Sequence, residues 1–341
     1  MPPTDATANV AEAVGEVAAA ISDADSIFIA AHENPDGDAV GSLLALRAIL
    51  IALGKTVHAA TPTSPPDRFA FIDGFEAILT EPPDEPADLG IALDCDGADR
   101  LGDLKDAIFA SRTVIDVDHH GGDNTFGDIQ LVDSGAAATA VLVWKVAREL
   151  GAGELGAGEL SPSQASALYV ALIADTGCFR FTNTSPEAMR LGAELIAAGA
   201  DPAELARRVF TIRPMEAVKL EARALSSLTT ADGVAIATLT YDDFAEIGAQ
   251  PELTEGIIDG FRDARGVRAA ALLKETEPGV WQVSMRGNGV DVAGVARSFD
   301  GGGHMFAAGC TIEGEREDVI ARLSEALQEA VDMPQGDALD A

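Results

Sequence analysis

Cysteine and long apolar runs are scarce in this chain of 341 residues. Its three cysteines, Cys95, Cys178 and Cys310, are odd in number and widely spaced, which argues against a disulfide framework and for a reducing compartment. No apolar run approaches the ~18 residues that a membrane span needs. Residues 1–9 carry no basic residue ahead of an apolar stretch, as a secretory signal would. These absences predict a cytoplasmic protein without membrane contact.

Positive charge is also scarce. Only 23 basic residues, five of them lysine, stand against 56 acidic residues, which gives a formal net charge of −33. Binding to long nucleic acids depends mainly on lysine and arginine side chains that neutralise phosphates. The charge therefore argues against long duplex nucleic acid as a partner and favours a short substrate held by a few local cations. Adaptation to a salt-rich cytoplasm is a second hypothesis, which full stability and activity at low ionic strength would contradict.

One histidine and two aspartates follow the first strand-like segment. Residues 26–31 form an apolar run typical of a buried strand, the next residues contain the turn sequence Asn-Pro-Asp-Gly, and residues 39–53 are typical of a helix. His32, Asp36 and Asp38 therefore lie at the carboxyl end of a strand, where open α/β sheets bind ligands. These donors suit a divalent metal such as Mn2+. An ordinary turn, whose Asp bonds its own backbone, is the alternative.

Three further apolar runs end in an acidic residue. Residues 89–93 and 113–117 are typical of strands and precede, respectively, Asp94 and Asp118-His119-His120, whereas residues 168–174 are typical of a helix and precede Asp175. An Asp at a strand end is often only the cap of the next helix, so each run alone leaves both interpretations open. The two adjacent histidines favour a metal site, because histidine is a frequent metal ligand and is uncommon in protein cores.

Taken in order, these segments resemble the four motifs of the DHH phosphoesterase superfamily: His32-x-x-x-Asp36-x-Asp38, Asp94, Asp118-His119-His120 and Asp175. Residues 299–304, followed by Ala-Ala-Gly at 307–309, resemble the glycine-rich signature of the associated second domain. The matches extend over nearly the whole chain. The short chain with two domains is most similar to the oligoribonuclease (nano-RNase) and phosphoadenosine-phosphate phosphatase branch. Met305 and Phe306 depart from the Pro and small polar residue usual after the signature histidine, which leaves the shape of that pocket open.

The resemblance implies a site for two Mn2+ ions, with Mg2+ or Co2+ as alternatives. One ion would be held by His32, Asp36 and Asp94, and the other by Asp38, Asp94, His119 and Asp175. Two ions that share a ligand, ~3.5–4 Å apart, lower the pKa of a water molecule between them and produce hydroxide near neutral pH. Asp94 is therefore expected to bridge the two ions.

Two catalytic residues and five substrate-binding residues follow from the same resemblance. His120 is expected to contact a phosphate oxygen in the transition state, and Asp118 to orient a metal ligand, with stabilisation of the strand end as its alternative. In the second domain, the residues expected to bind a phosphate of the substrate are Arg286, Gly301, Gly302, Gly303 and His304. Without the first domain, a plain glycine-rich turn before the strand 309–312 would be the preferred interpretation of residues 301–304.

The predicted architecture is α/β with two domains. A parallel-sheet DHH domain is expected over residues 1–200, a linker over 201–214, a smaller α/β DHH-associated domain over 215–333 and a disordered tail over 334–341, with the active site in the cleft between the domains. Strands are expected at 26–31, 56–60, 89–93, 113–117 and 129–132, and then at 233–241, 269–274 and 280–286. Helices are expected at 259–265 and 316–332. A duplicated pentapeptide over 151–160 is interpreted as a surface-loop insertion.

The resemblance implies a Mn2+-dependent phosphodiesterase that hydrolyses oligoribonucleotides of two to about five residues to mononucleotides, and 3′-phosphoadenosine 5′-phosphate to AMP. Alternatives are a cyclic-dinucleotide (c-di-AMP) phosphodiesterase, a RecJ-like exonuclease on single-stranded DNA, an inorganic pyrophosphatase and a non-catalytic nucleotide-binding module. The acidity and the lack of an extra nucleic-acid-binding domain disfavour the exonuclease. The expected partners are short RNA or small nucleotides, and a homodimer is left open.

Overall fold

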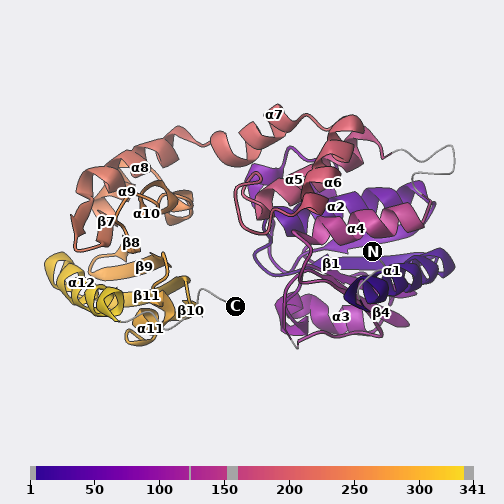
Figure 1. Cartoon of the computed structure of the whole chain (residues 1–341), viewed down its shortest axis with the longest axis horizontal. Coiled ribbons are helices and arrows are strands. Elements are labelled where there is room, and N and C mark those ends of the chain that lie inside the picture. Colours follow the sequence, from indigo (N-terminus) through magenta and orange to yellow (C-terminus); the bar gives the residue numbers. More distant parts are fainter. Residues whose placement is uncertain (1–4, 123, 152–159, 334–341) are drawn as a thin grey trace. The chain divides into compact units, whose positions relative to one another are not determined.

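The computed structural model describes residues 5–122, 124–151 and 160–333. The chain forms two compact units, Met1–Ile212 and Arg213–Ala341 (Figure 1). The expected linker, 201–214, contains the short helix α7 (Pro202–Ala206) and a π-helical turn, η4 (Arg207–Thr211). The expected tail at 334–341 and residues 152–159 of the duplicated segment lie outside the described residues.

The N-terminal unit is built on a parallel sheet of five strands in the order β2-β1-β3-β4-β5. The strands are β1 (Ser26–Ala31), β2 (Thr56–Ala60), β3 (Leu89–Leu93), β4 (Thr113–Asp118) and β5 (Ile129–Val132). The five predicted strands are confirmed, and β4 is one residue longer than expected. Strands buried on both faces are continuously apolar, which explains why the segments were readable in the sequence.

Helices cover both faces of this sheet. One face packs against α1 (Asp5–Asp23), α2 (Gly37–Ala52), α4 (Thr139–Glu149) and α5 (Pro162–Asp175), and α6 (Pro186–Ala197) packs on α5. The opposite face packs against η3 (Ala98–Leu104) and α3 (Lys105–Phe109). Two short 3-10 turns, η1 (Asp67–Phe69) and η2 (Phe75–Ala77), follow β2. In Figure 1 the helices α2, α4, α5 and α6 lie on one side of the sheet and α3 on the other.

The C-terminal unit contains a mixed sheet of six strands in the order β10-β11-β9-β8-β7-β6. The strands are β6 (Thr229–Ala231), β7 (Val234–Leu239), β8 (Ala269–Glu277), β9 (Val280–Gly287), β10 (Gly302–His304) and β11 (Ala307–Glu313). The helical elements are α8 (Met215–Ser227), α9 (Tyr241–Ile247), η5 (Pro251–Thr254), α10 (Asp259–Arg262), α11 (Val292–Arg297) and α12 (Arg316–Asp332). The predicted strands β7, β8 and β9 and the helices α10 and α12 are confirmed.

The two faces of this second sheet are covered unequally. Apolar residues of α11 and α12 pack on one face, along β7, β8, β9 and β11. On the other face, α8, α9 and α10 pack against β7 and β8 only. The outer strands β9, β11 and β10 therefore keep one face that the described apolar cores do not cover.

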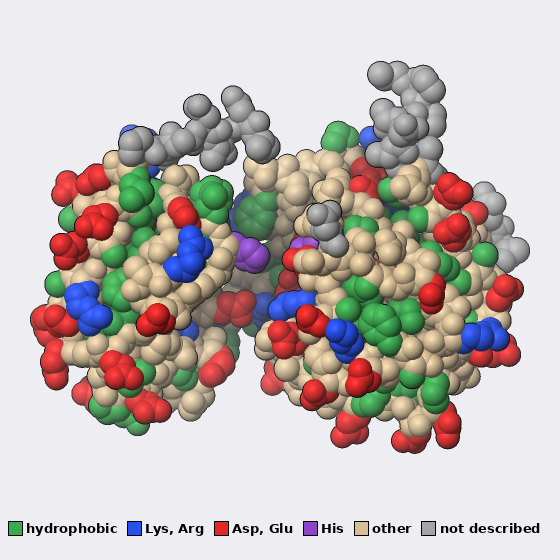
Figure 2. Space-filling model, turned by 90° about the horizontal axis from the view of Figure 1, so that it is seen from below, with side chains coloured by type: hydrophobic (Ala, Val, Ile, Leu, Met, Phe, Trp, Pro, Cys, Tyr) green, Lys and Arg blue, Asp and Glu red, His purple; other side chains and the backbone are tan. Residues whose placement is uncertain are grey.

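No helix in the described part of the chain is long and apolar enough to cross a membrane. Figure 2 shows acidic side chains spread over the visible surface of both units, with far fewer Lys and Arg side chains among them, as the net charge of −33 requires. A predominantly negative surface repels long polyanions.

Candidate metal centre

Two glycines let α2 lie directly against α5. A Cβ atom at Gly37 would come 2.5 Å from the Cβ of Ala174, and one at Gly41 would come 2.5 Å from the backbone oxygen of Ala167. Real Cβ atoms do not approach other atoms so closely, so only glycine permits this contact. The close packing brings the start of α2, which carries Asp38, beside the end of α5, which carries Asp175.

The segment between β1 and α2, together with the first turn of α2, supplies three of the predicted ligands. Asn34 adopts a left-handed conformation (φ 53°) that reverses the chain after the strand. Asp36 is the N-cap of α2, and its Oδ1 accepts hydrogen bonds from the N–H groups of Asp38 and Ala39. The cap that the alternative interpretation expected is therefore present. It uses one oxygen and leaves Oδ2 for another partner.

His32 is held so that its Nε2 faces Asp94. Its Nδ1 lies 2.7 Å from the backbone oxygen of Glu33, and its Nε2 lies 3.6 Å from Oδ2 of Asp94. The Glu33 carbonyl can only accept a hydrogen bond, which favours the neutral tautomer with the proton on Nδ1 and the lone pair on Nε2. The Arg100 guanidinium, 3.2 Å from the same Nδ1, contacts the Glu33 carboxylate as well.

Asp94 and His119 lie at the centre of the cluster. Asp94 directly follows β3 in a left-handed conformation (φ 61°), a strained geometry that is found most often at functional sites. Nε2 of His119 lies 3.1 Å from Oδ2 of Asp175, 3.5 Å from Oδ1 of Asp94 and 3.8 Å from Oδ2 of Asp38. The four sequence motifs, far apart in the chain, therefore meet at one edge of the parallel sheet.

Among the described residues, three groups of side chains have donor atoms within 4.8 Å of one another, a spacing that can hold a metal ion. They are His32, Asp36 and Asp94; Asp38, His119 and Asp175; and Asp94, His119 and His120. The first two groups contain all six predicted metal ligands. Asp94 belongs to the first and third groups and contacts His119 of the second, so its carboxylate is positioned between the sets.

Several carboxyl groups lie buried beside one another at this centre, and this changes their pKa values. Burial raises the pKa of the Asp38 carboxyl well above its usual value, and the neighbouring carboxylates of Asp94 and Asp175 add to the shift. Burial also raises the pKa of Asp36. For Asp94, burial alone would raise the pKa, but His32 and the charges of His119 and His120 bring it below the usual value. Buried carboxylates of this kind need a cation or a proton, and the oxygen and nitrogen donor set fits a divalent metal.

His120 is held by Asp118 rather than by the centre of the cluster. Nδ1 of His120 lies 2.7 Å from Oδ1 of Asp118, an oxygen that also accepts a hydrogen bond from the N–H of His119. The hydrogen bond to Asp118 raises the pKa of His120 to about 9. The His120 side chain is 43 % exposed, against 13 % for His119, so it can reach a ligand outside the cluster.

Sequence reasoning missed Thr139, the first residue of α4. Its hydroxyl donates to Oδ1 of Asp94 at 2.9 Å, and its N–H donates to Oδ2 of Asp38 at 2.5 Å. Ser42, one turn along α2, donates to Oδ1 of Asp38 at 2.9 Å. The alanine-rich segment before Thr139 gave no sign of these contacts, because both partners are distant in sequence.

In the C-terminal unit, strand pairing aligns two predicted substrate residues. His304 on β10 pairs with Ala307 on β11, and Ala307 pairs with Arg286 on β9. Directly opposed residues point to the same side of a sheet, so Arg286 and His304 flank a small alanine. Arg286 also pairs with Ala270 on β8, which packs under α8 and α9. Arg286 and His304 therefore lie on the uncovered face of β9, β11 and β10.

The glycine-rich segment was not predicted as a strand, yet residues 302–304 form the edge strand β10. A Cβ at Gly301 would lie 2.3 Å from the backbone oxygen of Gly309, and one at Gly303 would lie 2.6 Å from that of Ala307. These two glycines are thus required for packing against β11. Of the three glycines at 301–303, Gly302 alone has open space at its Cβ position, so a ligand could approach the backbone of this segment there.

We predict opposite outcomes for two of these glycines. Gly303→Ala should lower the free energy of unfolding by about 1–3 kcal/mol, because its φ of 134° and the clash with Ala307 both oppose a side chain. Gly302→Ala should change it by less than about 0.5 kcal/mol. Urea denaturation of both variants checks this. Equal losses would show that the hairpin geometry is different from that described.

Asp116 is a buried carboxyl of β4 outside the metal cluster. Its Oδ2 accepts a weak hydrogen bond from the N–H of Phe126 at 3.3 Å, while its Oδ1 is buried with no partner. Burial raises the pKa of this carboxyl to about 7. Between pH 4 and 7 the folded state keeps a proton that the unfolded state has lost, so stability falls as the pH rises through that window.

We therefore expect Asp116→Asn to stabilise the protein at pH 8 and to change little at pH 4. A shift from 3.8 to about 7 corresponds to at most ~4 kcal/mol, and we expect about 1–3 kcal/mol because the amide of Asn is itself a buried polar group. Denaturation of both proteins at each pH, with EDTA present, isolates the difference. A pH-independent difference would contradict a perturbed Asp116.

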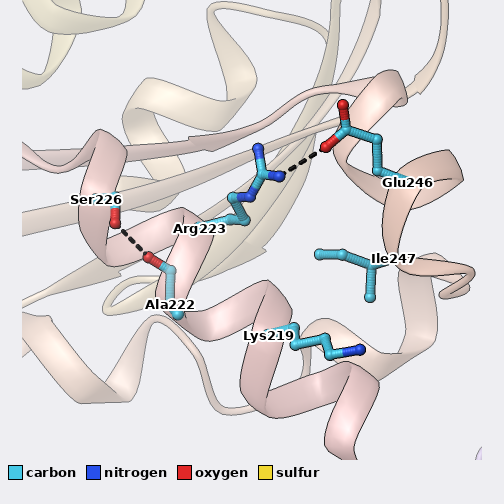
Figure 3. Close-up of a pocket in the computed structure, with 6 residues that line it drawn as sticks. All are labelled: Lys219, Ala222, Arg223, Ser226, Glu246 and Ile247. Carbon is cyan, nitrogen blue, oxygen red and sulfur yellow. Dashed lines mark hydrogen bonds and ion pairs between the residues drawn. The ribbon is translucent and has the colours of Figure 1, made fainter.

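A further groove lies in the C-terminal unit between α8 and α9. It has a volume of about 460 Å³ and is lined by Lys219, Ala222, Arg223, Ser226, Glu246 and Ile247. Figure 3 shows Arg223 turned toward Glu246, and Arg223 also pairs with Asp243. None of the predicted site residues lines this groove.

Comparison with known proteins places the chain in a family. The DHH family N-terminal domain matches residues 26–172, and the DHHA1 domain matches residues 232–333. The chain is 33% identical over 307 residues to the bifunctional oligoribonuclease and PAP phosphatase NrnA of Thermus thermophilus, covering 89% of each chain. It is 25% identical over 310 residues to the NrnA of Bacillus subtilis, covering 89% of this chain and 96% of the relative.

Solved structures agree on the fold. An exopolyphosphatase-related protein from Bacteroides fragilis superposes with a TM-score of 0.83 at 24% identity, covering 93% of this chain and 96% of that one. The exonuclease RecJ bound to manganese superposes with a TM-score of 0.54 at 16% identity, covering 96% and 95%. With the two domain matches and the Thermus relative, the resemblance of the motifs is confirmed: the chain belongs to the DHH family of phosphoesterases and is similar to the NrnA proteins.

Proposed function

We propose that the cluster at the carboxyl end of the parallel sheet binds two divalent cations, and that these are Mn2+ in preference to Mg2+ or Co2+. His32, Asp36 and Asp94 would hold one, and Asp38, Asp94, His119 and Asp175 the other. The observation that carries this is the convergence of four sequence motifs on donor groups spaced within 4.8 Å. When bound, such a pair of ions supplies hydroxide near neutral pH and neutralises charge on phosphate oxygens. The RecJ structure bound to manganese supports the choice of metal.

The residues around the cations have separate tasks in this proposal. Asp94 would contribute a ligand to both donor groups. The backbone carbonyl of Glu33 favours the tautomer of His32 in which Nε2 has a free lone pair. His120, exposed and hydrogen-bonded through Nδ1 to Asp118, directs its Nε2 toward a phosphate oxygen of the substrate. A donor held in advance stabilises developing charge without reorganising during the reaction.

We propose short oligoribonucleotides and 3′-phosphoadenosine 5′-phosphate as substrates. The names of the Thermus and Bacillus relatives join these two activities. The net charge of −33 favours short anions over long ones. In the C-terminal unit, Arg286, His304 and the backbone of Gly302 would bind a phosphate of the substrate, since arginine can hold a phosphate through two hydrogen bonds. A cytoplasmic location and a homodimer stay predictions.

Metal removal tests the chemistry of this proposal. Dialysis against EDTA should reduce hydrolysis of a 5′-phosphorylated diribonucleotide to background, and adding Mn2+ should restore it. Mg2+ and Co2+, added separately, compare the alternatives. Full activity in EDTA, with no ion bound by elemental analysis, would rule out the metal-dependent mechanism.

A further inference from the structure

Helix α4 has no side-chain cap of its own. Its N-cap residue is Ala138, whose side chain accepts no hydrogen bond. The first N–H groups of the helix are instead bound by Asp38, whose Oδ2 accepts from Thr139 at 2.5 Å and whose Oδ1 accepts from Ala140 at 3.1 Å. Asp38 is 101 residues away from Thr139 in sequence. A proposed metal ligand thus serves as the cap of a distant helix, and the helix fixes both of its oxygens.

The same residue of α4 also fixes the central carboxylate. The Thr139 hydroxyl donates to Oδ1 of Asp94 at 2.9 Å, and Thr139 is completely buried. This oxygen is the one that lies 3.5 Å from Nε2 of His119, whereas Oδ2 of Asp94 faces His32. A hydrogen bond to one oxygen sets the rotation of the whole carboxylate. The hydroxyl therefore determines which oxygen of Asp94 faces which donor group.

We propose that Thr139 is a positioning residue that holds Asp38 and Asp94 in fixed relation, so that both donor groups are formed before a metal ion binds. The proposal rests on the metal centre proposed above. Residues behind the ligands typically contribute about 10–100-fold to metal affinity or activity, because they fix the orientation of the ligands. Threonine suits this task, since its branched side chain has restricted rotation about χ1.

Two variants remove the hydroxyl and keep the backbone N–H. Thr139→Val preserves the shape of the side chain, and Thr139→Ala avoids any strain that the extra methyl group introduces. We expect each to bind Mn2+ about 10–100-fold more weakly in isothermal titration calorimetry. On a diribonucleotide at saturating Mn2+, kcat should fall while KM changes little, because Thr139 touches ligands and not substrate. Thr139→Ser keeps the hydroxyl and should restore Mn2+ affinity to within about threefold.

Thr254→Val is the matched control. Thr254 is a buried threonine of the C-terminal unit, and its hydroxyl donates to the backbone oxygen of Pro251 at 2.6 Å. This change removes an equivalent hydrogen bond and should leave Mn2+ affinity unchanged. Circular dichroism with EDTA establishes that each variant is folded.

Two outcomes separate this proposal from the proposed function. If Thr139→Val or Thr139→Ala, once folded, binds Mn2+ within twofold of the natural protein, the positioning role is overturned and the metal centre stands. A natural protein that binds no divalent ion overturns the metal centre and the role of Thr139 together.

Discussion

Asp94→Ala should lower kcat for a diribonucleotide by about a thousandfold or more while the protein stays folded. Asp94 contacts His32 and His119, which belong to different donor groups, so its loss weakens both. Metal ions contribute several kcal/mol to transition-state stabilisation, and each 1.36 kcal/mol is a factor of ten in rate. The fold should survive because removing a buried carboxylate also relieves repulsion from Asp36 and Asp38.

The measurement combines initial rates in Mn2+, calorimetric titration of Mn2+ and circular dichroism. Asp99→Ala is the control, since Asp99 is an exposed aspartate of the same unit that pairs with Lys105 on the surface. Asp94→Asn keeps the acceptor for Thr139 and should still lose most of the activity, because an amide is a poor bridging ligand. Activity of Asp94→Ala within tenfold of the natural protein would show that Asp94 does not bridge the groups.

His120→Gln should lower kcat by about 10²–10³-fold with little change in Mn2+ affinity. Positioned proton donors and charge-stabilising groups typically contribute effects of this size. His120 has two roles to compare, as a contact of the substrate and as a metal ligand, because it also belongs to a donor group with Asp94 and His119. Its exposure and its hydrogen bond to Asp118 favour contact with the substrate.

Calorimetry decides between the two roles of His120. A loss of Mn2+ affinity that parallels the loss of kcat would make His120 a metal ligand and contradict our assignment. Asp118→Asn keeps an acceptor oxygen beside His120 and should have a smaller effect, about tenfold. Equal effects of His120→Gln and Asp118→Asn would indicate that the pair acts as a unit.

The strands of both sheets that position the proposed sites were largely predictable. Continuous runs such as Ile27–Ala31 and Leu89–Leu93 are buried on both faces of a parallel sheet, so the sequence signal is strong. The residues at the ends of these strands must then meet at one edge, because parallel strands share their carboxyl ends. His32, Asp94 and His119, which follow β1, β3 and β4, were therefore readable from local patterns in the sequence combined with one rule of sheet topology. Asp38 and Asp175 lie in the helices α2 and α5, and the packing of these helices brings them together.

Contacts between distant segments were not predictable. The hydrogen bonds of Thr139 to Asp38 and Asp94 span 101 and 45 residues, and no local pattern encodes them. The strand β10 was missed because glycine has low strand propensity, and its pairing with β11 overrides this. The helices α8, α9 and α11 were also not predicted individually, since the last two are short and α8 has a largely exposed, weakly apolar sequence.

A comparison of four substrates tests most directly the claim that the protein hydrolyses short RNA. In the presence of Mn2+, product formation would be compared for a 5′-phosphorylated diribonucleotide, a 20-residue RNA, 3′-phosphoadenosine 5′-phosphate and cyclic di-AMP. We predict fast release of mononucleotides from the diribonucleotide, slower release of AMP from phosphoadenosine phosphate and almost no turnover of the 20-residue RNA. Faster turnover of the 20-residue RNA or of cyclic di-AMP would contradict the short-RNA assignment.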